Sequence, residues 1–103
     1  LPPHASALGM AIDNDGKLPA PFTGNLVLPY HGYRKHGHRV VAFKLDARGH
    51  AAGEPVELIG NWRAVAPPHA QPMGAPVAVR ITSDGAILIT EDRNGTVLRL
   101  TKP

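Results

Sequence analysis

Histidine, arginine and tryptophan side chains are gathered in a few segments of this 103-residue chain, between its apolar runs. Imidazole serves as a general base, a hydrogen-bond donor or a metal ligand. Arginine binds carboxylates with a two-pronged geometry, and tryptophan provides a stacking surface. Together these types suit a ligand that is anionic, planar or sugar-like. The residues concerned are His4, His31, Arg34, Lys35, His36, His38, Trp62, Arg63, His69 and Gln71.

Three groups in this set each have a functional and a purely structural interpretation. The basic cluster at residues 34–39 is either an anion site or a solvated loop. His31 is either a base or hydrogen-bond donor for a ligand, or a loop histidine satisfied by its neighbours. His36 and His38 are spaced so that both point to the same side of an extended strand, as two metal ligands would. Because no third ligand is evident, the sequence does not predict a metal site.

The acidic residues form two groups that are better interpreted as turns than as sites. Glu91 and Asp92 are adjacent, and adjacent strand residues point to opposite faces, so a β-turn beside Arg93 is favoured over a carboxylate pair. Residues 13–16, Asp-Asn-Asp-Gly, resemble the start of a calcium loop but lack its trailing glutamate. The sequence has no glycine-rich phosphate loop and no serine nucleophile motif.

Composition excludes several classes of protein. The absence of cysteine excludes disulfides, thiolate metal sites and a cysteine nucleophile. No apolar run approaches the ~20 residues of a membrane-spanning helix. The net charge is only +3 and aromatic residues are 5% of the chain, so neither a strong basic surface nor a stacking platform for nucleic acid is predicted.

The elements that must position these side chains are predicted to be strands. Glycine and proline each occur 11 times, which argues against long helices. Apolar residues alternate in short runs separated by Asp-Gly and Asn-Gly turns, the pattern of an all-β chain. The predicted strands cover residues 8–12, 25–30, 39–45, 55–59, 77–81, 86–90 and 96–100. The histidine-rich segments are the intervening loops 1–7, 29–38, 60–75 and 91–95.

The strands also repeat, because residues 8–16 resemble residues 76–85 and each is followed by two further strands. Four antiparallel strands per repeat is the pattern of a β-propeller blade. Residues 1–60 are then one blade, and residues 61–103 are three strands of the last blade. A ring needs at least ~4 blades, so we expect the chain to be the C-terminal part of a longer propeller or to assemble with other chains. The alternative is a self-contained sandwich of seven strands.

Several segments, in order and spacing, resemble the end of the glucose/sorbosone dehydrogenase family. The resemblance covers nearly all of the chain, and it implies the last two blades of a six-bladed propeller. It also implies oxidation of an aldose or related sugar by pyrroloquinoline quinone (PQQ), usually with calcium. The segments are 4–10 (HASALGM), 24–32 (GNLVLPYHG), 39–41 (RVV), 74–79 (GAPVAV), 83–85 (SDG) and 97–100 (VLRL).

The resemblance also implies roles for individual residues. The catalytic histidine of the family lies in an early blade, so no catalytic residue is expected here, and calcium ligands lie mostly outside this chain. His31, Gly32 and Arg34 resemble the sorbosone-type variant of the quinone site. Ala75 and Val77 stand where glucose-type members carry two arginines, which leaves the quinone carboxylates to other residues. The expected cofactor-binding residues are His4, His31, Gly32, Arg34, Lys35 and Arg63, and the expected substrate-binding residues are Trp62 and His69.

Two hypotheses from different classes follow. The first is the C-terminal segment of a periplasmic or secreted PQQ-dependent sugar dehydrogenase, inactive by itself. Its partners would be the remaining blades, a sugar and an electron acceptor such as a cytochrome or quinone. The second is a propeller that binds or scaffolds without catalysis, because a fold alone does not give a function. Neither hypothesis involves nucleic acid or a membrane span.

Overall fold

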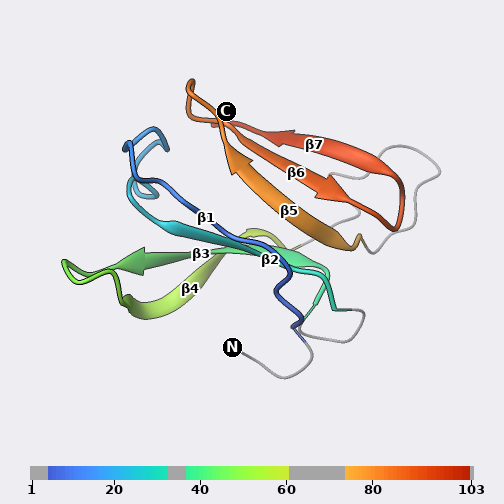
Figure 1. Cartoon of the computed structure of the whole chain (residues 1–103), viewed down its shortest axis with the longest axis horizontal. Helices are drawn as coiled ribbons and strands as arrows, with labels where there is room; N and C mark the ends of the chain where they lie inside the picture. Colours follow the sequence, from blue (N-terminus) through green and yellow to red (C-terminus); the bar gives the residue numbers. More distant parts are fainter. Residues whose placement is uncertain (1–4, 33–36, 61–73, 103) are drawn as a thin grey trace.

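The computed structural model describes residues 5–32, 37–60 and 74–102, and in these residues the chain is all-β. Seven strands form two antiparallel sheets, one of four strands in the order β1-β2-β3-β4 and one of three in the order β5-β6-β7 (Figure 1). The described residues include no helix that could cross a membrane. The strands are β1 (Ala11–Ile12), β2 (Leu26–Tyr30), β3 (Arg39–Leu45), β4 (Ala51–Ile59), β5 (Pro76–Ile81), β6 (Ile87–Glu91) and β7 (Thr96–Leu100).

All seven predicted strands are present, but two have clearly different limits. The first is only two residues long, because the chain before it passes close to β5 and pairs with β2 only at an isolated bridge between Ala7 and Tyr30. The fourth begins at Ala51 rather than at residue 55. It starts directly after a tight turn in which the Asp46 carboxylate accepts hydrogen bonds from the N–H groups of Arg48 and His50. This turn brings the chain back alongside β3 earlier than the apolar pattern indicates.

The two sheets pack face to face through one apolar core. Val27 and Val40 project from the four-stranded sheet toward Ile87 and Ile89 of the three-stranded sheet, and all four are buried. Alternate residues of β5 and β7, such as Val79 and Leu98, complete this layer from the edges. Each strand thus turns one face toward the core, which explains why apolar residues recur at every second position in the sequence.

The opposite face of the four-stranded sheet has a smaller cluster and an exposed apolar strip. Leu28, Tyr30 and Val41 are buried there beneath Ala5, with Leu26 and Phe43 partly covered. Beside them, alternate residues of the first strand and the segment before it remain open to solvent. Leu8 is 59% exposed, Met10 63% and Ile12 43%.

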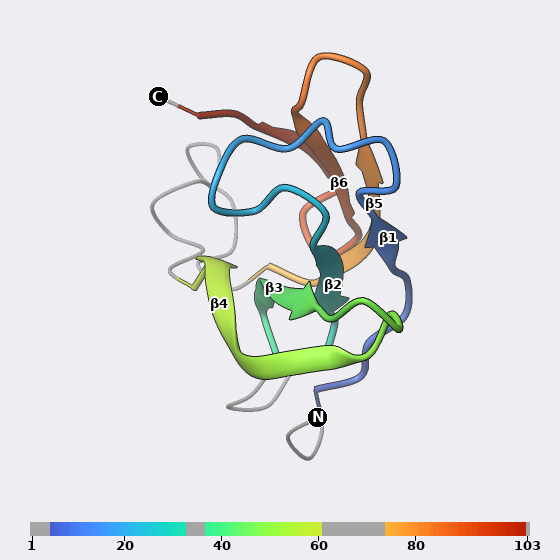
Figure 2. The ribbon, with the colours of Figure 1, turned by 90° about the vertical axis from the view of Figure 1, so that its left-hand side faces the viewer.

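Antiparallel order places alternate connections at opposite ends of the sheets. At one end lie the β1–β2 loop and the tight β3–β4 and β5–β6 turns, on the left in Figure 1. At the other end, which we call the loop end, lie residues 5–8, residues 31–32 and 37–38 between β2 and β3, the β6–β7 turn and the start of β5. The view in Figure 2 shows β4 bending sharply, where its pairing with β3 shifts register. Of the predicted histidine-rich loops, the described residues 5–7, 29–32, 37–38, 60, 74–75 and 91–95 belong to the loop end.

Glycine at position 85 allows the β5–β6 turn to pass directly beneath the β1–β2 loop. Gly85 has a φ of +85°, and a Cβ atom there would collide with the backbone oxygen of Lys17. Gly85→Ala is therefore expected to lower the free energy of unfolding by about 2 kcal/mol, measured by urea denaturation. Gly49 is the matched control because its φ is +80° but a Cβ atom added there would have no neighbouring atom within 4 Å. Equal losses for the two alanine variants would contradict the collision as the cause.

Candidate functional site

An imidazole–carboxylate pair joins the two sheets at the loop end. His31 directly follows β2, and Asp92 directly follows β6 in the other sheet. The His31 Nε2 atom lies 3.0 and 3.2 Å from the two carboxylate oxygens of Asp92. Because a carboxylate accepts, Nε2 donates in this pair, and Nδ1 is the acceptor nitrogen whenever the ring is neutral. Among the described residues, the side-chain hydrogen bonds of His31 are those of Nε2.

The backbone around His31 is fixed by the segment that precedes β1. The His31 N–H donates to the oxygen of Ser6 at 3.1 Å, and the Gly32 N–H donates to the oxygen of Ala5 at 2.9 Å. Gly32 is buried, so its amide is occupied within the chain and is not presented to a ligand. The structure thus brings His31 and Gly32 to the loop end as predicted. The His31 ring is partly exposed there, whereas the Gly32 N–H is already hydrogen-bonded within the chain.

His38 is buried at the start of β3, where only 7% of its surface is exposed. Its Nδ1 atom is 2.8 Å from the oxygen of Gly74, so Nδ1 carries a proton and donates to this carbonyl. The Nε2 atom is buried and has no hydrogen-bond partner among the described residues. The backbone φ angle of His38 is +58°, an uncommon conformation for a residue other than glycine. His38 therefore ties the start of β3 to the segment before β5, and in the described residues no group of three metal-ligating side chains includes it.

Tyr30 adds a second buried polar atom without a partner in the described part of the chain. It is the last residue of β2, and its hydroxyl has no hydrogen bond there although the residue is 2% exposed. Burial raises the pKa of this phenol, and the positive charge of Arg39 opposes that shift. No sequence signal singles out Tyr30, because a tyrosine at a strand end is ordinary in an apolar run.

Glu91 holds the β6–β7 turn together from within, which agrees with the predicted turn and not with a carboxylate pair. It is 2% exposed, and its carboxylate accepts from the N–H groups of Ala75, Arg93 and Asn94 and from the Thr96 hydroxyl, at 2.7–3.1 Å. Burial alone would raise the pKa of Glu91. The hydrogen bonds made to the charged form outweigh burial and hold this pKa below its ordinary value.

Asp13 has a similar structural role at the opposite end of the sheets. Its carboxylate accepts from the N–H groups of Lys17, Leu18 and Gly24 at 2.7–3.0 Å and so organises the β1–β2 loop. Burial would raise the pKa of Asp13, but these hydrogen bonds lower it. Residues 13–16 are a turn, as predicted, and the Asp13 oxygens accept from backbone N–H groups.

Most of the other predicted site residues cannot be compared with the structure. Of the expected cofactor-binding and substrate-binding set, only His31 and Gly32 are described. The predictions for the following residues lie outside the described ranges: His4, Arg34, Lys35, Trp62, Arg63 and His69.

The described part of the loop end is polar but is not a cationic cradle. A quinone with three carboxylates requires positive side chains. Among the described cations at the loop end, Arg39 is bonded to Glu57 at 2.6 Å, and Arg93 is exposed in the β6–β7 turn beside Asp92. Ala75 is buried and its N–H is taken by Glu91. One exposed arginine is not enough to hold three carboxylates, so the described residues do not by themselves fit PQQ. In its neutral form the His31 imidazole can accept a hydrogen bond at Nδ1.

The chain matches no protein-family model, no curated protein and no solved structure.

Proposed function

We propose that the chain is the C-terminal, two-blade part of a PQQ-dependent sugar dehydrogenase of the aldose or sorbosone type. In this proposal the loop end contributes to the cofactor and sugar site, and the protein acts in the periplasm or outside the cell. The observation that carries the proposal is the hydrogen bond between His31 and Asp92, which joins the two sheets at the loop end. The sequence resemblance supplies the reaction.

The arrangement of the sheets supports the blade interpretation. Strand β5, the first of its sheet, lies against β1 and β2, the first strands of the other. Neighbouring propeller blades pack face to face in this way. The strip formed by Leu8, Met10 and Ile12 also supports it, because a preceding blade would cover these exposed apolar side chains.

The His31–Asp92 pair has a chemistry that suits a sugar. Asp92 fixes the tautomer and the orientation of the ring, so Nδ1 is the atom that accepts a hydroxyl hydrogen. A hydrogen bond of this kind positions the hydroxyl group without removing its proton. When bound, the quinone would supply the oxidation of the sugar. His31 is therefore proposed as a substrate-positioning residue and not as the base.

The cofactor assignment is tested in the complete protein. Arg34→Ala is expected to weaken quinone binding about tenfold, the scale of one lost charge-assisted hydrogen bond. The measurement is a reconstitution titration of the apo protein with PQQ and calcium, followed by dye reduction with glucose or sorbosone. Arg48→Ala is the matched control, since Arg48 lies in the β3–β4 turn at the opposite end of the sheets. Equal binding by the two variants would remove Arg34 from the site.

The second candidate is a propeller that binds without catalysis. It is favoured by Ala75 and Val77, which stand where glucose-type members carry arginines, and by the engagement of Ala75 with Glu91. The complete protein would then fail to reduce dye with any aldose even at saturating PQQ and calcium. Dye reduction that depends on both quinone and sugar would reject this alternative.

A further inference from the structure

Three dipeptides in the turns of this chain join an aspartate or an asparagine to glycine. They are Asp15-Gly16 in the β1–β2 loop, Asp84-Gly85 in the β5–β6 turn and Asn94-Gly95 in the β6–β7 turn. In such a dipeptide the glycine nitrogen can attack the side-chain carbonyl carbon of the residue before it, because glycine has no Cβ atom to crowd the approach. Asn94-Gly95 is the most reactive of the three by residue type, since asparagine is thermally labile.

The glycine nitrogen is held by a hydrogen bond in two of these dipeptides. The Gly16 N–H donates to the oxygen of Asp13 at 3.2 Å, and the Gly85 N–H donates to the oxygen of Thr82 at 3.1 Å. The Gly95 N–H makes no such bond to the described part of the chain. A hydrogen bond of this kind directs the nitrogen away from the side chain before it and so hinders ring closure. This protection is present at Gly16 and Gly85 and is missing at Gly95.

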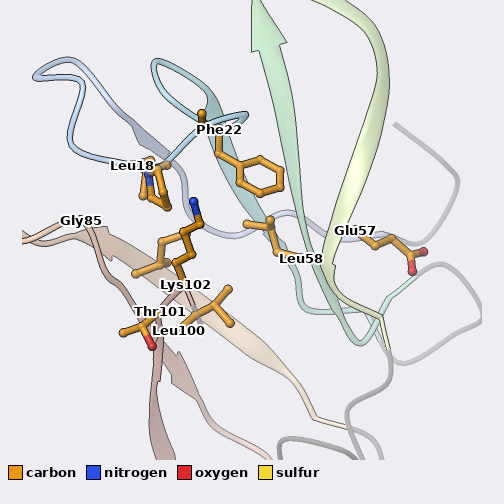
Figure 3. A pocket seen from close by; sticks show the side chains of 11 residues that line it. Leu18, Phe22, Glu57, Leu58, Gly85, Leu100, Thr101 and Lys102 are labelled. Atoms are coloured by element: carbon orange, nitrogen blue, oxygen red, sulfur yellow. The ribbon is translucent and has the colours of Figure 1, made fainter.

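The surroundings of Gly95 are open, whereas those of Gly85 are confined. Gly95 is exposed with a φ of +67°, and a Cβ atom added there would have no neighbouring atom within 4 Å. Gly85 instead passes beneath the β1–β2 loop and lies beside Leu18 at the edge of a cavity of about 340 Å³ (Figure 3). The peptide between Asn94 and Gly95 therefore has room to rotate toward the Asn94 side chain.

The rest of the β6–β7 turn is fixed on both sides of this peptide. Before it, the N–H groups of Arg93 and Asn94 donate to the Glu91 carboxylate at 2.7–3.1 Å. After it, Thr96 pairs with Glu91 across the hairpin and donates its hydroxyl to the same carboxylate at 3.1 Å. The structure of the turn therefore depends on contacts that converge on Glu91 from both sides of the reactive peptide.

We propose that Asn94 is a site of spontaneous deamidation and that this reaction loosens the loop end as the protein ages. The Gly95 nitrogen loses its proton and bonds to Cγ of Asn94, while the bond from Cγ to Nδ2 breaks and ammonia leaves. Water then opens the ring at one of its two carbonyl carbons, which leaves aspartate or isoaspartate at position 94. Water is the co-reactant, and nothing is oxidised or reduced. The proposal stands independently of the sugar dehydrogenase assignment.

Both products change the contacts that hold the turn. Each adds a carboxylate within three residues of Glu91 and Asp92, and like charges at this separation repel. Isoaspartate also lengthens the backbone by one carbon, which shifts Thr96 relative to the Glu91 carboxylate that it now contacts. Because Asp92 lies in this turn and bonds to His31, the modification is expected to loosen the His31–Asp92 pair as well.

The reaction is measured by incubating the 103-residue chain in mildly alkaline buffer, folded and in urea. Peptide mass spectrometry gives the conversion at each asparagine, and an isoaspartate-specific methyltransferase labels the isomerised product. We expect Asn94 in the folded chain to react within about tenfold of its rate in urea. Asn14 is the matched control, because it is exposed in a turn but precedes Asp15 rather than glycine, and it should react at least about tenfold more slowly than Asn94.

Hydrogen exchange measures the consequence for the turn. In the aged chain the amides of Arg93 and residue 94, which donate to Glu91, should exchange faster. The Gly24 amide, which donates to Asp13 at the opposite end of the sheets, should keep its rate. An aged Asn94→Gln variant should show no change at either end, because its side chain closes a ring far more slowly. Asn94→Asp adds the charge without the longer backbone and should accelerate exchange less than ageing does.

Three results would overturn the proposal. One is conversion of Asn94 that is fast in urea and absent in the folded chain, because the turn would then prevent ring closure. Another is equal conversion of Asn94 and Asn14 in the folded chain, because the open glycine nitrogen would then not be the cause. The third is complete conversion of Asn94 with unchanged exchange at residues 93 and 94, because the modification would then leave the loop end intact.

Discussion

Replacing Glu91 with alanine is expected to lower the free energy of unfolding by about 4 kcal/mol. The carboxylate is 2% exposed and accepts hydrogen bonds from four donor groups, at 2.7–3.1 Å. Each buried donor that loses its acceptor costs about 1–3 kcal/mol, and the Ala75 N–H is the most enclosed of the four. A small domain has only about 5–15 kcal/mol to lose.

The measurement is urea denaturation at pH 7, followed by circular dichroism. Glu91→Gln keeps one acceptor oxygen but turns an amide toward donors, so we expect a loss between those of the alanine variant and the control. Arg93→Ala is the matched control, because the Arg93 side chain is exposed in the same turn and the variant keeps the backbone N–H that donates to Glu91. A loss below about 1 kcal/mol for Glu91→Ala would show that water replaces the carboxylate, and the side chain would then not be what holds the turn.

Glu91 also connects stability to the candidate site. It fixes the turn that begins with Asp92, and Asp92 orients the His31 ring across the gap between the sheets. A variant that loosens this turn is therefore expected to release the imidazole as well. Hydrogen exchange at the Arg93 and Asn94 amides reports on the turn directly, since both donate to Glu91.

The strands were predictable because each has one inward face. Alternation in residues such as Val77, Val79 and Ile81 follows directly from that burial, and the Asp-Gly turns mark where strands end. The early start of β4 was not predictable, because Ala51 and Ala52 carry no alternation. Their strand conformation comes from the turn at Asp46 and from pairing with β3.

The candidate site was predictable only as a set of loops. His31 was selected for its type and position, but its partner Asp92 is 61 residues away and no local pattern links the two. The turn beside Arg93 was correctly predicted, although Glu91 itself is the last residue of β6, and the burial of Glu91 depends on the approach of Ala75 from the segment before β5. The spacing of His36 and His38, which resembles that of two metal ligands, was equally uninformative. The Nδ1 atom of His38 instead donates to a backbone oxygen that is 36 residues away. A hydrogen-bond partner that comes from a distant part of the chain cannot be identified from the residues that surround the first group in the sequence.

Asp13 is expected to give the second largest effect, at the other end of the sheets. Three backbone N–H groups of the β1–β2 loop converge on its buried carboxylate. Asp13→Asn keeps the size of the side chain but replaces a charged acceptor by an amide that can offer only one oxygen. We expect a loss of about 3 kcal/mol at pH 7, because hydrogen bonds to a charged group contribute about 1.5–3 kcal/mol each and part of this is retained.

The pKa of Asp13 determines how this loss depends on pH. Burial raises the pKa, the three backbone hydrogen bonds lower it, and the net result is a folded-state value below the ordinary 3.8. At pH values near 4 the unfolded chain therefore binds more protons at this position than the folded chain. The stabilisation is complete above the unfolded-state pKa and is lost as the pH falls through the folded-state pKa. Glu91, whose pKa is also lowered, adds to the same acid sensitivity.

The difference in the free energy of unfolding between the unsubstituted chain and the Asp13→Asn variant should therefore be smaller in acid than at pH 7. Urea denaturation at pH 7 and again at about pH 2 is expected to give a large difference at the first pH and a small one at the second. Asp15→Asn, in the same turn but exposed, serves as the control and should change little at either pH. A loss for Asp13→Asn that is equally large in acid would mean that shape rather than charge at residue 13 holds the loop. The backbone hydrogen bonds would then stabilise the protonated side chain as well as the ionised one.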